Sequence, residues 1–435
     1  MTWTRTRAAS VLALGTASAL LLSACGSTPE ASSGPSHAPV VVTVGFYGDF
    51  GLTKLEAKYE KTHPWVDIQL KSGDYAPQHD LLQQALETGS GAYTVSAIDE
   101  GYLSRFVPQA DSFVNLLDLG AGDYKKDFPD WAWAEAANTD GSKVIAIPNS
   151  LYGLAVCYRS DLFAAAGLKS DSATVSSTIS GSWDNFISEG QKYVAATGKP
   201  FIDDGTTVLD PAVKQLGTGH SYYDANLKLD MPNIKPAFDT ATGVIGAKLS
   251  ANIARYSPEW YSWLSNGAYA AVICPQWMLG MIQKNVPADF TGKWDIATLP
   301  GTGGNQGGSF WAIPKQGTAD EQAAGYDFVK WLLEPEQQIE MMTETGTLSA
   351  QTALLTSDTV KAFTSAFFNG APYGDVFARS ILGIKAPVSF APKNLTLEAG
   401  MESVLTQVES GDVSIADAWD LALATADAGD AASST

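Results

Sequence analysis

The hydrophobic pattern in the first third of the chain alternates between two periods. Runs rich in β-branched residues predict strands at 40–50, 66–73 and 93–99, and apolar residues spaced three or four positions apart predict helices at 52–63 and 79–89. Strands and helices that alternate in this way are typical of βαβ units, so we predict a mainly parallel sheet. Ligands of such sheets bind beyond the carboxyl ends of the strands, which directs attention to the residues there.

The middle of the chain continues this mixture of strands and helices. Residues 140–168 predict a strand, an interruption at Pro148, a second strand and a helix that begins near Asp161. Residues 180–198 predict a helix whose first turn is capped by Ser182. We therefore expect an α/β arrangement here as well.

The last third combines a pair of strands with several helices. Residues 294–318 predict a strand, a Gly-rich loop and a second strand. Residues 318–346 predict a helix that is broken at Pro335, because proline cannot continue the helical hydrogen bonds. Two more helices are predicted at 396–411 and 414–429.

One predicted strand, "GAYAAVICPQW" at 267–277, ends in a tryptophan. Pro275 stops the strand two residues earlier, so we expect the ring of Trp277 at the edge of the sheet and not inside it. More aromatic residues, Trp260 among them, lie just upstream. Aromatic surface near a strand end is either core packing or a flat platform for a ligand.

The first 24 residues are typical of an export signal. Arg5 and Arg7 precede an apolar run at 8–24, which is short for a membrane span and typical of a signal peptide. The run ends in "LSAC", which resembles the bacterial lipobox and predicts a lipid-modified Cys25; the alternative is an ordinary signal peptide with an incidental cysteine. Residues 25–39 are rich in Ser, Pro, Gly and Ala and predict a flexible tether. We expect an exported protein anchored at the outer face of the cytoplasmic membrane.

Composition and charge narrow the function. The 435 residues are 45% hydrophobic and 17% charged, which is ordinary for a globular protein with two or three domains' worth of core. The formal net charge of −20 disfavours binding to nucleic acid or to anionic lipid surfaces, and it leaves a neutral small ligand open.

Two cysteines remain in the predicted mature part of the chain, Cys157 and Cys274. In an oxidising compartment they can form a disulfide. Both also lie in strand-like stretches, where a cysteine serves equally well as a small buried hydrophobe. The sequence leaves both alternatives open.

Several segments, taken in order, resemble the extracellular solute-binding proteins of ABC importers. The carbohydrate-binding group, which includes maltose- and cello-oligosaccharide-binding proteins, is similar to this chain in "TVGFYGDFGLTKLEAKYEKTHPWVDIQL", "DGSKVIAIPNSLYGLAVCYRSDLFAAAGL", "SNGAYAAVICPQW", "GGSFWAIPK" and "AAGYDFVKWLLEPEQQIEMMTETGTLSA". Each motif alone is weak, and the ordered set covers most of the chain.

The resemblance implies an α/β fold of two lobes, which is the periplasmic-binding-protein fold of class II type. The chain is expected to cross between the lobes about three times at hinges, and the lobes are expected to close on a ligand. The lobes are expected at 40–149 with 308–352, and at 150–307 with 353–435. The resemblance also implies a monomer that delivers its ligand to ABC permease subunits, with no cofactor and no metal.

A sugar ligand requires flat rings for its C–H faces and acceptors for its hydroxyls. For stacking we predict Trp260, Trp277 and Trp311, and for combined ring and hydroxyl contact Tyr47, Tyr152 and Tyr373. As acceptors we predict Asp49 and Asp99, which follow the first and third strands, with Glu100 as an alternate. The competing interpretation of both aspartates is helix capping.

Two other functions compete with sugar transport. Asp49 and Asp99 could form the acid and base of an exported glycoside hydrolase. Against an enzyme, the chain has no Gly-x-Ser-x-Gly, no His-Glu-x-x-His, no P-loop lysine and no histidines at metal-ligand spacing. A binding protein for a non-sugar solute is the other alternative. We predict a non-enzymatic oligosaccharide-binding protein, with β-linked gluco- or xylo-oligosaccharides favoured.

Overall fold

The computed structural model describes residues 38–216, 222–223, 228–384 and 394–432. The predicted signal peptide (1–24), the predicted lipidation site Cys25 and nearly all of the predicted tether (25–39) lie outside the described residues. In the described parts of the chain no helix is long and apolar enough to cross a membrane.

Eight strands of the described residues form one connected sheet. They are β1 (Val40–Tyr47), β2 (Val66–Gly73), β3 (Val95–Asp99), β4 (Ala146–Arg159), β5 (Ala271–Pro275), β6 (Trp294–Thr298), β7 (Asn305–Ala312) and β8 (Leu348–Ser349). The main path runs β2-β1-β3-β7-β4-β5, and β6 and β8 each pair with β4.

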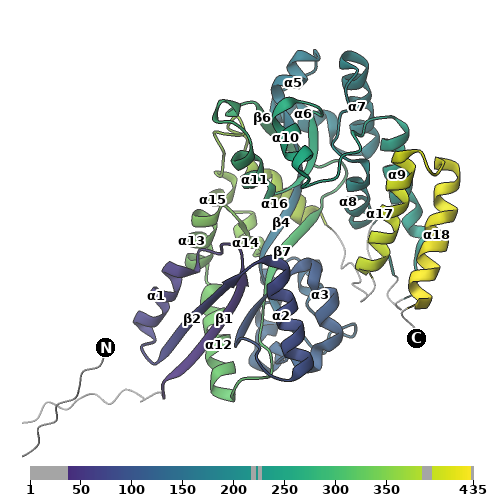
Figure 1. The fold of residues 1–435 in the computed structure, drawn as a ribbon. Helices are drawn as coiled ribbons and strands as arrows, with labels where there is room; N and C mark the ends of the chain where they lie inside the picture. The colour runs from purple at the N-terminus through teal and green to yellow at the C-terminus, as the bar shows by residue number, and fades with distance from the viewer. Residues whose placement is uncertain (1–37, 217–221, 224–227, 385–393, 433–435) are drawn as a thin grey trace, which may run out of the picture. The chain divides into compact units, whose positions relative to one another are not determined.

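Strand β4 belongs to both lobes of the molecule. Its first part, residues 146–153, pairs with β7 and β8, and its second part, residues 154–159, lies between β5 and β6. Figure 1 shows β4 and β7 running between the lobe that carries β1 and β2 and the lobe that carries β6. The predicted two-lobe α/β fold is confirmed.

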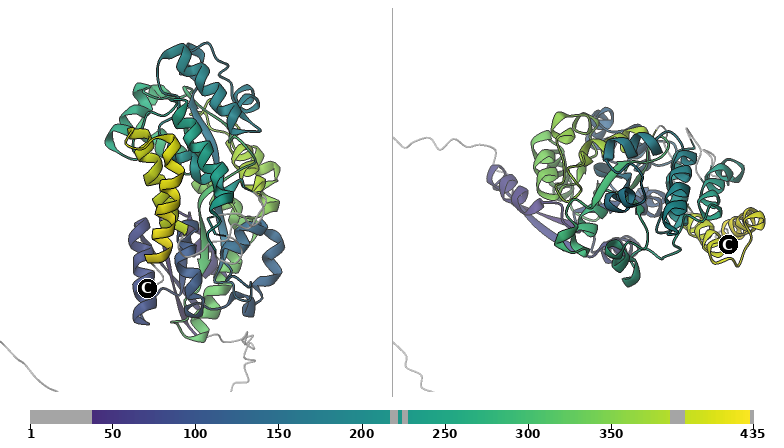
Figure 2. Two further views of the ribbon diagram at one scale, coloured as in Figure 1. Left: turned by 90° about the vertical axis from the view of Figure 1, so that its right-hand side faces the viewer. Right: turned by 90° about the horizontal axis from the view of Figure 1, so that it is seen from above.

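The helices cover both lobes. Those packed near β1–β3 are α1 (Leu52–Thr62), α2 (Tyr75–Thr88), α3 (Glu100–Phe106), α4 (Asp130–Glu135), α12 (Ala319–Leu332) and α13 (Pro335–Thr345). The others are α5 (Ser160–Ala165), α6 (Ser172–Ile179), α7 (Trp183–Thr197), α8 (Leu209–Lys214), α9 (Met231–Gly246), α10 (Pro258–Asn266), α11 (Met278–Asn285), α14 (Thr352–Leu355), α15 (Asp358–Lys361), α16 (Tyr373–Gly383), α17 (Asn394–Ser410) and α18 (Ile415–Ala432). The two views of Figure 2 show α17 and α18 side by side at one edge, and both helices contact α9.

Several helix ends follow directly from the sequence. Ser182 caps α7 as predicted, because its hydroxyl accepts a hydrogen bond from the N–H of Asn185. Thr318 and Glu321 form a capping box that starts α12. Pro335 begins α13, so the predicted break in the long helical segment is confirmed.

Two expectations about the sheet were wrong. Among the eight strands of the described residues, the pairs β1–β2 and β1–β3 are parallel and the remaining pairs are antiparallel, because β4 and β7 cross between the lobes in opposite directions. The expected interruption at Pro148 is a bulge inside a continuous β4, where the register to β7 shifts between Pro148 and Ser150. A bulge tolerates proline, because the missing N–H falls where the ladder is already disturbed.

Two clusters of buried hydrophobic side chains meet at the second part of β4. Ala155 and Cys157 belong to one cluster, and Leu154, Val156 and Tyr158 belong to the other. Neighbouring residues of a strand point to opposite faces, so this half of β4 is buried on both sides.

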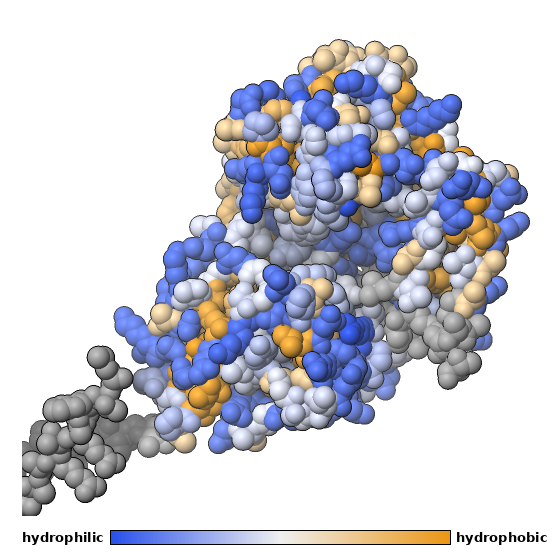
Figure 3. Space-filling model, in the orientation of Figure 1, coloured by the Kyte–Doolittle hydropathy of each residue, from blue (hydrophilic) through white to orange (hydrophobic). Residues whose placement is uncertain are grey.

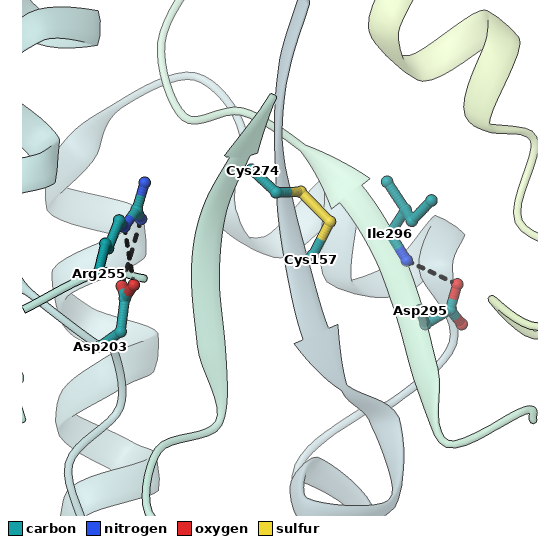
Figure 4. Close-up of a disulfide and its surroundings, with 6 residues drawn as sticks. All are labelled: Cys157, Asp203, Arg255, Cys274, Asp295 and Ile296. Carbon is teal, nitrogen blue, oxygen red and sulfur yellow. Dashed lines mark hydrogen bonds and ion pairs between the residues drawn. A yellow bond between two sulfur atoms is a disulfide. The ribbon is translucent and has the colours of Figure 1, made fainter. Parts of the chain in front are cut away.

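A disulfide links β4 to β5. Cys157 and Cys274 are bonded, with 5.8 Å between their Cα atoms, and both side chains are fully buried (Figure 4). Of the two alternatives left open by the sequence, the structure contains the bond. It fastens the strand that precedes Trp277 to the strand shared by both lobes.

Candidate functional site

A cavity of about 1030 Å³ lies between the lobes. The surface in Figure 3 is recessed between the upper and lower lobes. The aromatic residues that line the cavity are Tyr47, Phe50, Tyr75, Tyr152, Tyr222, Tyr256, Tyr261, Trp277, Phe368 and Tyr373. The charged residues that line it are Asp49, Asp99, Glu100, Asp210, Lys214 and Glu398. Rings and carboxylates therefore converge from both lobes on one space.

Six of the predicted ligand-binding residues line this cavity: Tyr47, Asp49, Asp99, Tyr152, Trp277 and Tyr373. They come from the ends of β1, β3 and β5, from the middle of β4 and from the start of α16. These segments are far apart in the chain, and the fold brings them together. Contact of each with a ligand stays a prediction.

The stacking roles predicted for Trp260 and Trp311 do not fit the structure. Both side chains are fully buried and neither lines the cavity. Trp260 is on the core-facing side of α10, where its Nε1 donates to Oδ2 of Asp203 at 2.9 Å. Trp311 lies in β7 between β3 and β4, and its ring packs on Phe50 with 5.5 Å between the ring centroids.

One side of the cavity is a hydrogen-bonded group that we call the Asp99 cluster: Tyr47, Tyr75, His79 and Asp99. Oδ1 of Asp99 accepts hydrogen bonds from the hydroxyl of Tyr75 at 2.9 Å and from the N–H of Gly101 at 3.0 Å. Oδ2 accepts from the N–H of Gly308 at 3.4 Å and lies 3.3 Å from the hydroxyl of Tyr47. The single proton of that hydroxyl is shared with the carbonyl of Gly308, which lies 3.0 Å away. A carboxylate offers about four acceptor sites, so the protein itself uses most of those on Asp99.

Hydrogen bonds also determine the state of His79 in this cluster. Its Nε2 accepts from the N–H of Asp99 at 2.9 Å, so its Nδ1 carries the proton and donates to the carbonyl of Tyr75 at 2.7 Å. Burial lowers the pKa of His79, which favours this neutral form. Burial raises the pKa of Asp99, and the hydrogen bonds from Gly101 and Tyr75 oppose that shift.

A second side of the cavity is aromatic, and we call Tyr256, Tyr261 and Trp277 the Trp277 wall. The rings of Tyr256 and Trp277 lie 6.2 Å apart between centroids at an angle of 37°. Nε1 of Trp277 donates to the carbonyl of Gln306 at 3.2 Å, which fixes the ring against β7. Trp277 and Tyr261 are only partly buried, so their faces remain available to a ligand.

The two sides meet at Gly307, whose backbone has a φ of 87°. A β-carbon added there would lie 3.2 Å from Cδ2 of Tyr152, 3.5 Å from Oδ2 of Asp99 and 3.6 Å from Nε1 of Trp277. The left-handed backbone favours glycine at this point, and of the three contacts only the one with Tyr152 would be tight.

Asp49 has more free acceptor capacity than Asp99. Its side chain is exposed at the cavity, and Oδ1 accepts a hydrogen bond from the N–H of Gly51, the residue before α1. The N-cap residue of α1 is Gly51, and no side chain caps this helix, so Asp49 stabilises the turn before α1 and does not cap it. Its second oxygen is not used by that turn, which leaves the ligand interpretation in place as a prediction.

Glu100, the alternate acceptor, is also engaged by the protein. Its Oε1 lies 3.2 Å from Nζ of Lys214, and its Oε2 accepts from the N–H of Gly307 at 2.8 Å. Lys214 also donates to the carbonyl of Asn305 at 2.6 Å. Burial raises the pKa of Glu100, and Lys214 opposes the shift. This buried ion pair joins α3 of one lobe to α8 of the other.

Sequence reasoning missed several residues that line the cavity, above all Tyr75, Tyr256, Lys214 and Glu398. Tyr75 follows the end of β2, so the rule that directed attention to the ends of β1 and β3 could have found it. The other three lie in loops and helices of the second lobe, and no local pattern marks them. Within the described residues, no group of three His, Cys, Asp or Glu side chains is arranged to hold a metal ion.

The sequence model described as "bacterial extracellular solute-binding protein" matches residues 54–367. The chain belongs to this family. The family predicted from the ordered motifs is confirmed, and its members are binding proteins for transport and not enzymes.

Relatives of this solute-binding protein agree with that assignment. The arabinooligosaccharide-binding protein of Bacillus subtilis (strain 168) is 27% identical over 328 residues, which cover 68% of this chain and 70% of the relative. A crystal structure of an extracellular solute-binding protein of family 1 superposes with a TM-score of 0.83 at 29% identity and covers 90% of this chain and 100% of its own.

A third protein shows the same fold at lower identity. The ABC-transporter-associated binding protein of B. animalis subsp. lactis Bl-04, solved in complex with β-1,6-galactobiose, has a TM-score of 0.68 at 21% identity and covers 90% of this chain and 98% of its own.

Proposed function

We propose that this protein captures an oligosaccharide between its two lobes and delivers it to the permease of an ABC importer. The observation that carries the proposal is the cavity of about 1030 Å³ with aromatic rings from both lobes and carboxylates around them. Aromatic faces bind the C–H surfaces of sugar rings, and polar side chains bind the hydroxyls. Names of relatives, such as arabinooligosaccharide-binding protein, support a sugar as the ligand.

An oligosaccharide fits better than a single sugar. The cavity volume lies at the upper end of the range of small-molecule sites, and aromatic residues are spread from Tyr75 on one side to Tyr373 on another. Two classes of ligand are therefore candidates. The sequence predicts β-linked gluco- or xylo-oligosaccharides, and the names of the relatives suggest arabino-oligosaccharides.

The anchoring proposal completes this function. A lipid on Cys25 and the tether of residues 25–39 would hold the binding protein at the outer face of the cytoplasmic membrane, close to the permease subunits. Export itself agrees with the family, whose description is extracellular. Metabolic labelling with a fatty acid, compared between wild type and Cys25→Ala, tests the anchor directly.

A ligand panel tests the central proposal. A soluble form beginning at Gly26 is titrated by calorimetry with maltose, cellobiose, longer α- and β-linked gluco-oligosaccharides, xylo-oligosaccharides and arabino-oligosaccharides. Saturable binding to one linkage series supports the function and identifies the sugar. Absence of heat with every sugar, from a protein that melts cooperatively, would contradict the function and favour a non-sugar solute.

A further inference from the structure

A smaller chamber of about 240 Å³ opens beside the main cleft. The two cavities share Asp210, Tyr256 and Gln306 in their linings, so the chamber is a side branch of the cleft and not a separate hollow in the core. Its volume is that of roughly eight water molecules in the liquid, which is comparable to one sugar residue.

The lining of this side chamber is suited to hydroxyl groups. The hydroxyl of Thr206 donates to Oδ1 of Asp204 at 2.7 Å, and that of Thr207 donates to the carbonyl of Asp204 at 2.7 Å. Both hydroxyl oxygens therefore keep acceptor capacity. Glu402 also lines the chamber, with a partly buried side chain. Burial raises the pKa of Glu402 to about 7, with Asp210 and Asp204 adding to the shift, so near neutral pH this group can donate as well as accept.

The charges of the chamber disfavour an anionic guest. Asp204, Asp210 and Glu402 line it, and the one cation among its lining residues is Arg255. Arg255 is already committed to the buried Asp203, through Nε at 2.8 Å and Nη2 at 3.3 Å (Figure 4). A carboxylate entering the chamber would therefore meet acidic groups, and the charge of the cation beside it is already balanced by Asp203.

Tyr256 stands at the junction of the two cavities, and its backbone is held there. Its φ of 66° is unusual for a bulky residue, so the surrounding structure must impose it. The preceding residue, Arg255, is clamped by Asp203, which also accepts from Nε1 of Trp260. The ring of Tyr256 packs between Trp260, at 5.6 Å, and Trp277, at 6.2 Å. Trp260 thus positions this junction from the core, although it does not line the cleft.

We propose that the side chamber receives a single neutral sugar residue that branches from an oligosaccharide held in the main cleft, with Tyr256 as the ring at the branch point. This inference rests on the proposed function and adds to it that the preferred ligand is branched. A uronic acid branch is excluded by the acidic lining.

The test compares three ligands on one backbone: the linear oligosaccharide that binds best, the same oligosaccharide with one neutral pentosyl or hexosyl branch, and the same with a uronosyl branch. Calorimetry is performed on wild type and on Thr207→Phe, which fills the chamber. Thr343→Phe is the matched control, because Thr343 is exposed on α13 and lines neither cavity. Tyr256→Ala, which removes the ring at the junction, is the second variant if Thr207→Phe does not fold.

We expect the neutral branch to bind at least about tenfold more tightly than the linear form, and the uronosyl branch to bind less tightly than the neutral one. Thr207→Phe should abolish the preference and leave linear binding within about twofold. The inference fails if the wild type and both variants bind the linear and the neutrally branched ligand with equal affinity. That result would mean that the chamber holds only water, and the proposed function would still stand. If no sugar binds, both fail together.

Discussion

The Asp99 cluster and the Trp277 wall border the same cavity, but they are held in place by different interactions. In the first, three hydrogen bonds from the protein and a nearby tyrosine hydroxyl hold one carboxylate, and a histidine in a single tautomer accepts from the backbone N–H of the same aspartate. In the second, partly exposed rings pack on one another, and the main polar contact is one hydrogen bond from Trp277 to a carbonyl.

The difference indicates that the Asp99 cluster and the Trp277 wall have different roles in the site. A carboxylate whose acceptors are mostly used by the protein defines the shape of the site more than it attracts hydroxyls. Rings with free faces supply binding energy through contact with apolar surface. The Asp99 cluster therefore sets where β1, β3 and β7 meet, and the Trp277 wall supplies the surface for the ligand.

The disulfide behind the Trp277 wall gives the largest predicted effect. Cys157 and Cys274 are separated by 117 residues, and closing a loop of that length stabilises the folded state by about 2–5 kcal/mol. We expect reduction to lower the free energy of unfolding by this amount, measured by urea denaturation with and without reductant. In the form beginning at Gly26 these are the only cysteines.

The control for reduction is the variant Cys157→Ala with Cys274→Ala, whose stability should not respond to reductant. Alkylation under denaturing, non-reducing conditions provides an independent check. Two alkylated thiols in the wild type would show that the bond is absent in solution and that packing alone holds this wall.

Asp99→Asn should have the next largest effect. One end of the amide would turn its NH₂ toward either the N–H of Gly101 or the N–H of Gly308, since both oxygens of Asp99 accept from backbone donors. Two facing donors in a buried site cost about 2 kcal/mol. We expect the free energy of unfolding to fall by that amount in urea denaturation. Asp80→Asn, which changes an exposed aspartate on α2, should be nearly neutral.

A loss of affinity in Asp99→Asn without any loss of stability would contradict this interpretation. It would mean that Asp99 binds the ligand directly, as first predicted, and that the cluster tolerates a rearranged hydrogen bond. Tyr75→Phe separates a structural role of Asp99 from a ligand-binding role further. It removes one hydrogen-bond donor to Asp99 and leaves the charge of the carboxylate in place.

Much of the fold could be predicted because its signals are local. The cap at Ser182 and the break at Pro335 depend on a few neighbouring residues, and both are present as expected. The direction of pairing is not local. Strands β4 and β7 have the composition of buried strands whichever way they run, so the antiparallel crossings were not visible in the sequence.

The candidate site shows the same limit. Trp277 follows a strand that proline ends, and it lines the cavity; Trp311 lies inside a strand with neighbours on both sides and is buried. Trp260 lies on a helix, where only the packing of that helix decides which side is covered. Tyr256 carries no sequence signal, because its position depends on a buried ion pair between two loops.

Trp277→Ala gives the smallest of these free-energy changes. It distinguishes most clearly between the contribution of the Trp277 wall and that of the Asp99 cluster. Removing the ring takes away contact surface without leaving a buried polar group unpaired, so the fold should be retained. We expect the affinity for the oligosaccharide to fall at least about tenfold, or roughly 1.4 kcal/mol, measured by calorimetry because the mutation alters the fluorescence. Trp331→Ala, on α12 and outside the cavity, should leave the affinity unchanged. If Trp277→Ala folds and binds normally, the Trp277 wall is packing, and the hydroxyls and carboxylates around the Asp99 cluster must supply the binding energy instead.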